Sequence, residues 1–161
     1  MTSEELWAQM VSAEHSYYAA RMELHRSGEY VEQLRRVLKG NRSVETALRA
    51  LQDARPETLE ALIDELFPQA VNYLEKTPAG VDILTRLDPD WLKPRLPILV
   101  DEFLAQPNTD YFQYRLLAIV LDKLRQPEAL QILIDRAAKS DDREVVDEVE
   151  DFRAYPTARI D

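Results

Sequence analysis

The chain of 161 residues contains no cysteine and only three glycines. Without cysteine there can be no disulfide framework, thiol nucleophile or thiolate metal ligand, which fits a protein of the reducing cytoplasm. Three glycines leave little room for the glycine-rich loops that cradle phosphates or dinucleotides. The Gly-x-Ser-x-Gly motif of many hydrolases is missing as well. We therefore expect a non-enzymatic protein that needs no cofactor.

Long apolar runs are equally scarce. The longest spans the six residues Leu116–Leu121, against the roughly 20 apolar residues that a membrane-spanning helix needs. Near the amino terminus, Glu4 and Glu5 stand where a secretory signal carries positive charge. We therefore expect a soluble, cytoplasmic protein with no membrane partner.

Positive charge is also in short supply, because 30 acidic residues against 20 basic ones give a net charge of −10. Such a charge repels nucleic-acid phosphates. Eight basic residues lie between Arg21 and Arg55, but five acids are interleaved with them, so we expect no nucleic-acid partner. Residues 141–151 contain seven acids and one arginine, a segment that would steer a basic protein partner.

The chain is rich in apolar residues that recur at intervals of three and four, without strand-like alternation. This period predicts an all-α fold, with residues 1–152 forming a single helical domain and residues 153–161 a flexible tail. A first helix, capped by Thr2 and Glu5, is expected to end near Arg26, and a second to run from about Glu29 to Gly40. Residues 1–40 are thus predicted to form an antiparallel helical hairpin.

Aromatic and apolar residues on that first helix are expected to face the core. The expected stripe comprises Leu6, Met10, Ala13, Tyr17 and Leu24. The aromatic residues Trp7, Tyr17 and Tyr18 are assigned to the core as well.

Prolines help to place the later helices, because a proline in the first turn removes an amide hydrogen that would be unpaired anyway. A short helix is expected over 43–54, and Pro56, Pro78 and Pro127 are expected to begin others. Pro68 should end a helix near residue 67. Residues 90–105 are predicted to form a turn that leads into a kinked helix, and further helices are predicted over 110–125, over 127–139 and over 142–152.

One short pattern recurs along the second part of the chain. It reads LIDE at 62–65, LVDE at 99–102 and LIDR at 133–136, at spacings of 37 and 34 residues. Residues 96–108 align with 130–142 without a gap. Such a period indicates stacked pairs of helices.

The repeat has a particular form. Its features are the Leu96-Pro97 pair early in one helix, the polar turn at 106–108, and Tyr114, Arg115 and Ala118 in the next helix. In these respects residues 56–152 resemble HEAT-like α-helical repeats. The first unit departs from that pattern at Pro68, and neither the first nor the third unit has an arginine matching Arg115. The resemblance implies a short α-solenoid of antiparallel helix pairs that binds proteins.

The recurrent aspartates, Asp64, Asp101 and Asp135, are a candidate metal set. On a helix each lies away from the apolar pair that precedes it, and stacked helices stand about 8–10 Å apart, too far for three carboxylates to share one ion. We therefore expect a solvated acidic row and no bound metal. His15 and His25 also lack a metal-binding spacing.

The expected partner-binding surface combines two features. Tyr111 and Tyr114 lie one helical turn apart beside Arg115, a composition enriched at protein interfaces. The other feature is the set of acids Asp142, Asp147, Glu148 and Asp151. The opposing interpretation is that the tyrosines pack between repeats and the acids form an ordinary solvated face.

These features favour a protein–protein interaction module with a basic partner, for example a bacterial immunity or antitoxin protein that occupies a basic nuclease toxin. One alternative is an adaptor or assembly factor that holds a helix or peptide in a concave groove. Another is a helical enzyme or ligand-binding bundle that uses Glu14, His15 and Tyr18. Nucleic-acid binding through the basic residues of 21–55 is a more distant alternative. The oligomeric state stays open.

Overall fold

A computed structural model describes residues 1–40, 42–76, 78–107 and 109–147. The described residues contain ten complete helices and no strand, so the expected all-α class is confirmed. The helices are α1 (Ser3–Arg26), α2 (Tyr30–Lys39), α3 (Val44–Leu51), α4 (Pro56–Glu60), α5 (Ile63–Asn72), α6 (Ala79–Leu84), α7 (Pro89–Leu92), α8 (Leu96–Leu104), α9 (Tyr111–Lys123) and α10 (Pro127–Ala137).

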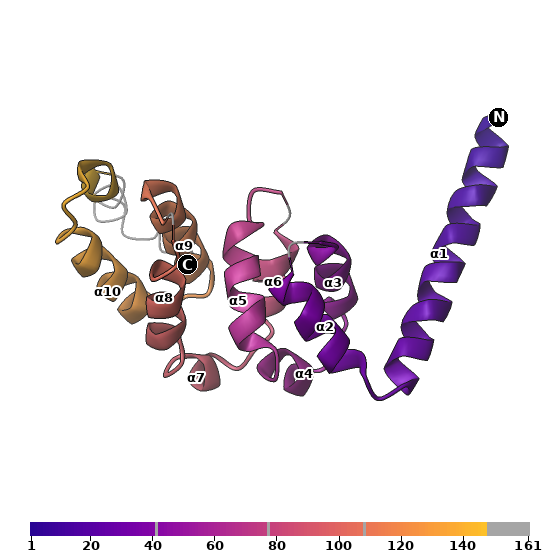
Figure 1. Ribbon diagram of the computed structural model, residues 1–161, viewed down its shortest axis with the longest axis horizontal. Helices are drawn as coiled ribbons and strands as arrows, with labels where there is room; N and C mark the ends of the chain where they lie inside the picture. Colours follow the sequence, from indigo (N-terminus) through magenta and orange to yellow (C-terminus); the bar gives the residue numbers. More distant parts are fainter. Residues whose placement is uncertain (41, 77, 108, 148–161) are drawn as a thin grey trace, which may run out of the picture.

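Helices α2 to α10 follow one another along the long axis of the molecule in chain order (Figure 1). Helices α2, α5, α8 and α10 pack side by side in that order. On one side of this row, α3 packs on α2 and α6, α6 packs on α5, and α9 packs on α5, α8 and α10. We call this assembly of α2 to α10 the stack.

The main core of the stack is built from aliphatic side chains together with Tyr30, Phe67 and Phe103. A smaller cluster of Ile134, Ala137 and Val145 lies at the α10 end. In all three copies of the repeated pattern the first two residues are buried, and they lie on α5 or its N-cap, on α8 and on α10. The following aspartates Asp64, Asp101 and Asp135 are exposed. The predicted outward orientation of these carboxylates is therefore confirmed.

The helix end predicted at Pro68 is wrong. Helix α5 continues through Pro68 to Asn72 instead of ending near residue 67. Over 90–105 the structure has the expected turn followed by a helix, because the single turn α7 ends at Leu92 and α8 begins at Leu96. In α5, packing on both sides outweighs the loss of one backbone hydrogen bond at proline, a cost of about 3 kcal/mol.

The carboxyl-terminal helix is described only in part. It begins at Arg143 and is described as far as Asp147. The rest of the helix expected over 142–152, and the tail expected over 153–161, lie outside the described residues.

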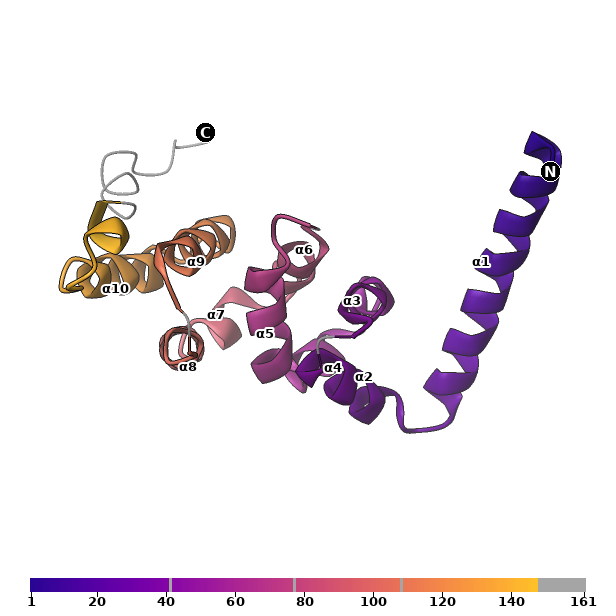
Figure 2. The same cartoon turned by 45° about the horizontal axis from the view of Figure 1, so that its top comes forward.

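Helix α1 is placed differently from the others. It meets α2 near the Ser27–Gly28 turn and then leaves the stack at an open angle, with the amino terminus at its far end (Figures 1 and 2). None of its 24 residues is buried. The hairpin expected over residues 1–40 is therefore splayed, and the two helices do not pack along their lengths.

The expected burial of the α1 stripe and aromatics is wrong, because no residue of α1 is buried and Leu6 and Met10 are exposed. Trp7 is 65% exposed and Tyr18 is 50% exposed, while Tyr17 is half-buried. Two features account for this: α1 leaves the stack at an open angle, and it is longer than α2. Helix α1 is about 36 Å long at 1.5 Å per residue, whereas α2, with 10 residues, is about 15 Å long and cannot cover it.

Candidate protein-binding surfaces

The tyrosines of the predicted partner site lie at the start of α9. Asp110 begins the helix with a capping box, in which its side chain accepts a hydrogen bond from the Phe112 amide at 2.9 Å and the Gln113 side chain accepts one from the Asp110 amide at 3.1 Å. This cap fixes Tyr111, which is 39% exposed, and Tyr114, which is half-buried against the apolar core. Arg115 is exposed beside them.

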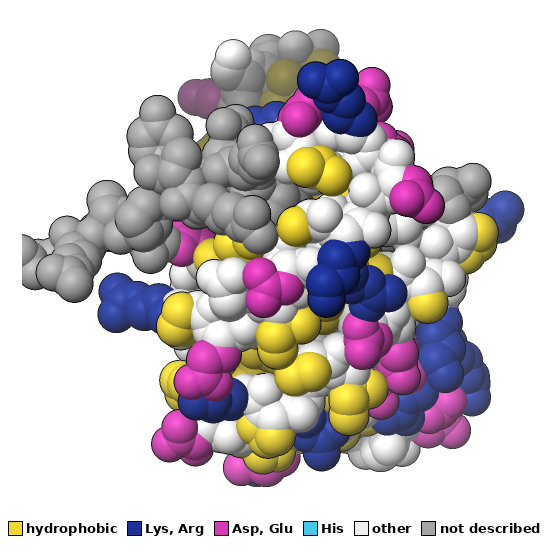
Figure 3. Space-filling view, turned by 90° about the vertical axis from the view of Figure 1, so that its left-hand side faces the viewer, with side chains coloured by type: hydrophobic (Ala, Val, Ile, Leu, Met, Phe, Trp, Pro, Cys, Tyr) yellow, Lys and Arg dark blue, Asp and Glu magenta, His cyan; other side chains and the backbone are white. Residues whose placement is uncertain are grey.

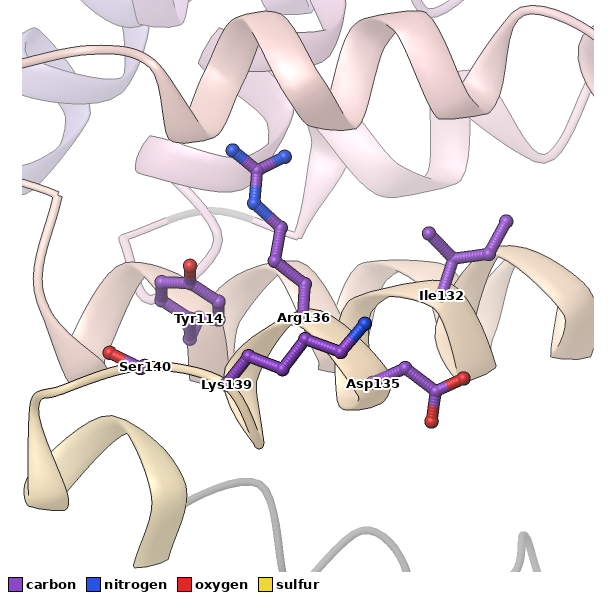
Figure 4. A pocket seen from close by; sticks show the side chains of 6 residues that line it. All are labelled: Tyr114, Ile132, Asp135, Arg136, Lys139 and Ser140. Atoms are coloured by element: carbon purple, nitrogen blue, oxygen red, sulfur yellow. The ribbon is translucent and has the colours of Figure 1, made fainter.

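Tyr114 lines a groove of about 530 Å³ at the end of the stack (Figure 4). We call it the α10 groove; its lining residues are Tyr114, Ile132, Asp135, Arg136, Lys139 and Ser140. The Arg136 side chain turns toward α8 and forms an ion pair with Asp101. Tyr111 and Arg115 are not part of the lining, so the structure brings only one residue of the predicted aromatic cluster into this groove.

The predicted acidic residues are only partly described. Asp142 accepts a hydrogen bond from the Glu144 amide at 2.9 Å and so caps the helix that begins at Arg143. Asp147 forms an ion pair with Arg143 at 3.8 Å. Both acids are exposed, whereas Glu148 and Asp151 lie outside the described residues. Figure 3, which looks onto the α10 end, shows acidic and basic side chains interspersed with apolar ones on the described surface.

Several basic residues of 21–55 are paired within the stack. Arg35 forms ion pairs with Glu32 at 2.8 Å and with Glu65 at 3.3 Å, and Lys39 reaches the same Glu65 carboxylate at 3.3 Å. The hydrogen bond that the Arg35 guanidinium donates to the Glu32 carboxylate raises the pKa of Arg35 above its ordinary value. These cations stabilise the contact between α2 and α5 and do not form an open basic surface for phosphates.

Residues considered for a metal or a reaction do not converge. Glu14, His15 and Tyr18 are all exposed on α1, where no second element packs over them. Among the described residues, no group of three or more histidines and carboxylates is close enough to hold a metal ion. A second groove, of about 540 Å³, lies at α2, α5 and the end of α8, and its lining includes Gln69, Asn72 and Gln106.

The surface that sequence reasoning missed lies on α1. Its large apolar side chains that are exposed form what we call the α1 face: Leu6, Trp7, Met10, Tyr18 and Met22. Their exposed fractions are 48% to 65%. Large apolar side chains left exposed together on one element are typical of interaction sites. The missed signal was the length of the first helix compared with its neighbours.

The base of α1 is fixed to the stack. One Arg21 nitrogen donates to the Ala50 carbonyl at 2.9 Å, and another pairs with Asp53 at 3.2 Å. The Tyr30 hydroxyl donates to the same Ala50 carbonyl at 2.9 Å. The His25 ring stacks on Tyr30, with ring centroids 4.1 Å apart and planes 17° apart. These contacts set the direction in which α1 projects.

The far part of α1 is supported by local interactions. Thr2 and Glu5 form the predicted capping box, with the Glu5 amide donating to Thr2 at 3.2 Å and the Thr2 amide donating to Glu5 at 2.7 Å. Acids occupy the first turn, while His25 and Arg26 occupy the last, which complements the helix dipole. No glycine or proline interrupts the helix. Helix α1 therefore has the local stability to extend beyond its neighbours.

Comparisons with protein-family models, with curated proteins and with solved structures found no match. None of the described helices combines the length and the apolar character that crossing a membrane requires. The function of the protein is consequently inferred from the geometry of the α1 face and of the stack.

Proposed function

We propose that this protein is a non-enzymatic protein-binding module, built as a short HEAT-like α-solenoid from which α1 extends as a docking arm. The observation that carries the proposal is the α1 face, which leaves large apolar side chains in water on a helix that is firmly anchored at its base. The ungapped repeat of α8 in α10 and the packing of α2, α5, α8 and α10 in one row support the solenoid.

A partner would bury the apolar side chains that α1 leaves in water. Burying a large apolar side chain is worth about 1.5–3 kcal/mol. Most helices in globular proteins obtain this energy from the core of their own domain, and α1 does not. Trp7 and Met10 are large anchors of the kind enriched at the centres of interfaces. A partner that covered them would recover several kcal/mol, enough for specific binding.

The test is affinity capture from the native host with matched variants. Leu6→Gln, Trp7→Ser and Met10→Gln together remove apolar surface from α1 without touching its base. The matched control, Ile98→Gln, removes an exposed isoleucine from α8. We expect the α1 variant to lose, and the control to keep, the proteins that the wild type captures, as measured by quantitative mass spectrometry. Retention of every captured protein by the α1 variant would contradict the proposal.

A second candidate is favoured by the net charge of −10 and by the acids at the carboxyl end. In this version the protein neutralises a basic protein, as an immunity protein would a nuclease toxin, and association is steered by charge. Asp142→Lys with Asp147→Lys should then slow association about tenfold at low salt and much less at physiological salt, as measured by stopped-flow mixing with the captured partner. An unchanged rate at low salt would rule this version out.

A further inference from the structure

The chemistry of α1 indicates which kind of partner fits it. We propose that the α1 face receives an amphipathic helix of a partner protein whose apolar side is edged by lysine or arginine. This inference depends on the proposed docking function of α1 and adds the chemistry of its occupant. It differs from charge steering by residues 141–151, because it places the contact on the amino-terminal helix.

The shape of the surface favours a helix as the occupant. The apolar residues of α1 recur at intervals of three and four, with Leu6, Trp7 and Met10 within little more than one turn and Tyr18 and Met22 two to three turns further on. Such a surface presents ridges and grooves that accept the side chains of a second helix at an interaxial distance of about 8–10 Å. The anchored base holds the surface in place, so an occupant need not order it first.

The charge on α1 favours a partner helix that carries lysine or arginine. Residues 1–20 contain Glu4, Glu5 and Glu14 and no lysine or arginine. The amino group of Met1 lies 3.9 Å from Glu5 and offsets one of these charges. The outer part of α1 therefore pairs apolar surface with negative side-chain charge only.

At the opposite end of the stack acids also outnumber bases within residues 141–147, but several acids of that end are paired with cations, as Asp147 is with Arg143 at 3.8 Å. There Lys93 pairs with Glu128 at 2.9 Å, and Arg136 pairs with Asp101. Lysines or arginines that edge a partner helix would meet Glu4, Glu5 and Glu14 on α1, where residues 1–20 contain no competing lysine or arginine. The same charge counts against a second copy of this chain, which would bring another α1 with the same three glutamates and another net charge of −10.

Trp7 provides a direct reporter of occupancy. The chain has two tryptophans, and the other, Trp91, is half-buried under Arg95, whose guanidinium carbon lies 4.4 Å from its ring centre. The variant Trp91→Phe leaves Trp7 as the sole tryptophan. Two synthetic 18-residue amphipathic peptides serve as probes: one of leucine and lysine, the other of leucine and glutamate in the same pattern. A lysine peptide with shuffled order lacks the apolar face.

We expect the leucine–lysine peptide to shift Trp7 emission to shorter wavelength and to bind at least about tenfold more tightly than the leucine–glutamate peptide. Leu6→Gln with Met10→Gln should abolish the shift, while Ile98→Gln, at an exposed position of α8, should leave it unchanged. Far-ultraviolet circular dichroism verifies that each variant keeps its helix content. The shuffled peptide should cause no shift.

Three outcomes would overturn the inference. The first is that the two amphipathic peptides bind equally or not at all. The second is that the variant with Leu6→Gln and Met10→Gln still binds the leucine–lysine peptide. The third is that Trp7 emission shifts as the protein concentration rises without peptide, with dimers detected by sedimentation. The last result would identify a second copy as the occupant. If host capture still depended on α1 in any of these cases, the docking function would stand and only the chemistry of the partner would be wrong.

Discussion

Helix α1 and the stack are both helical and both carry large apolar side chains, yet these side chains lie in opposite surroundings, exposed on α1 and buried in the stack. The helices of the stack have between 4 and 13 residues, and each has at least one buried side chain. Helix α1 has 24 residues and buries none. The comparison shows that the apolar side chains of a helix are buried only where other helices pack alongside it over the same length.

The two regions also hold their shape by different means. In the stack, side chains from successive units interlock around a shared core, and ion pairs such as Lys93–Glu128 bridge neighbouring helices. Helix α1 is capped at its amino-terminal end and makes three contacts with the stack at its base. Most of its length packs against no other described helix. Mutations should therefore have opposite consequences in the two regions.

The sharpest contrast compares one aromatic residue from each region. Phe67 in α5 is fully buried, so Phe67→Ala should lower the free energy of unfolding by about 3–5 kcal/mol. Trp7→Ala should change it by less than about 0.5 kcal/mol, because the Trp7 side chain is mostly in water. Urea unfolding followed by circular dichroism measures both. Equal losses would mean that α1 packs as the stack does.

Close backbone packing inside the stack offers a second comparison. A Cβ at Gly80 would lie 2.7 Å from the Ala70 Cα, so Gly80→Ala should push α6 away from α5 and cost about 1–3 kcal/mol. Gly40→Ala is the control, since its added Cβ would make only ordinary contacts, the nearest at 3.4 Å. Thermal unfolding of both variants checks this, and similar midpoints would contradict the packing at Gly80.

The junction between the two regions can be loosened selectively. Arg21→Met removes the hydrogen bond to the Ala50 carbonyl and the contact with Asp53, each a charge-assisted bond, and should cost about 1–2 kcal/mol. Amide hydrogen exchange should become faster in α1 and stay nearly unchanged in α8 and α9. Arg26→Met, on the exposed surface of the same helix, serves as control. Uniformly faster exchange throughout the stack would show that α1 is not a separate unit.

The smallest expected effect is a pH dependence at the same junction. Burial raises the pKa of the Tyr30 phenol above its ordinary value of 10.0, because the neutral form is favoured inside the protein. Its contribution to stability is complete below pH 10 and is lost as pH rises through the folded-state pKa. Between pH 9 and 11 the wild type should lose more unfolding free energy than Tyr30→Phe. Tyr18→Phe, at an exposed site, should follow the wild type.

Part of the candidate site could be predicted from local pattern alone. The cap that fixes Tyr111 and the outward orientation of Asp101 and Asp135 follow from helix period and first-turn chemistry. That Tyr114 would line a groove with Ile132 and Lys139 could not be predicted, because the groove depends on how α9 and α10 pack. The α1 face was missed for a related reason, since a helical wheel records which residues share a face and not whether another helix covers it.

The sequence by itself determined the helical class, the capping of α1 and α9, and the buried pairs of the repeated pattern, because spacing and first-turn chemistry are local properties. Only the tertiary structure decided that α5 passes through Pro68 and that α1 stands apart from the stack. Both outcomes depend on which surfaces meet, and that depends on the lengths and packing of elements distant in the chain. Local periodicity creates an apolar face, but only the neighbours of that face decide whether it becomes core or a binding surface.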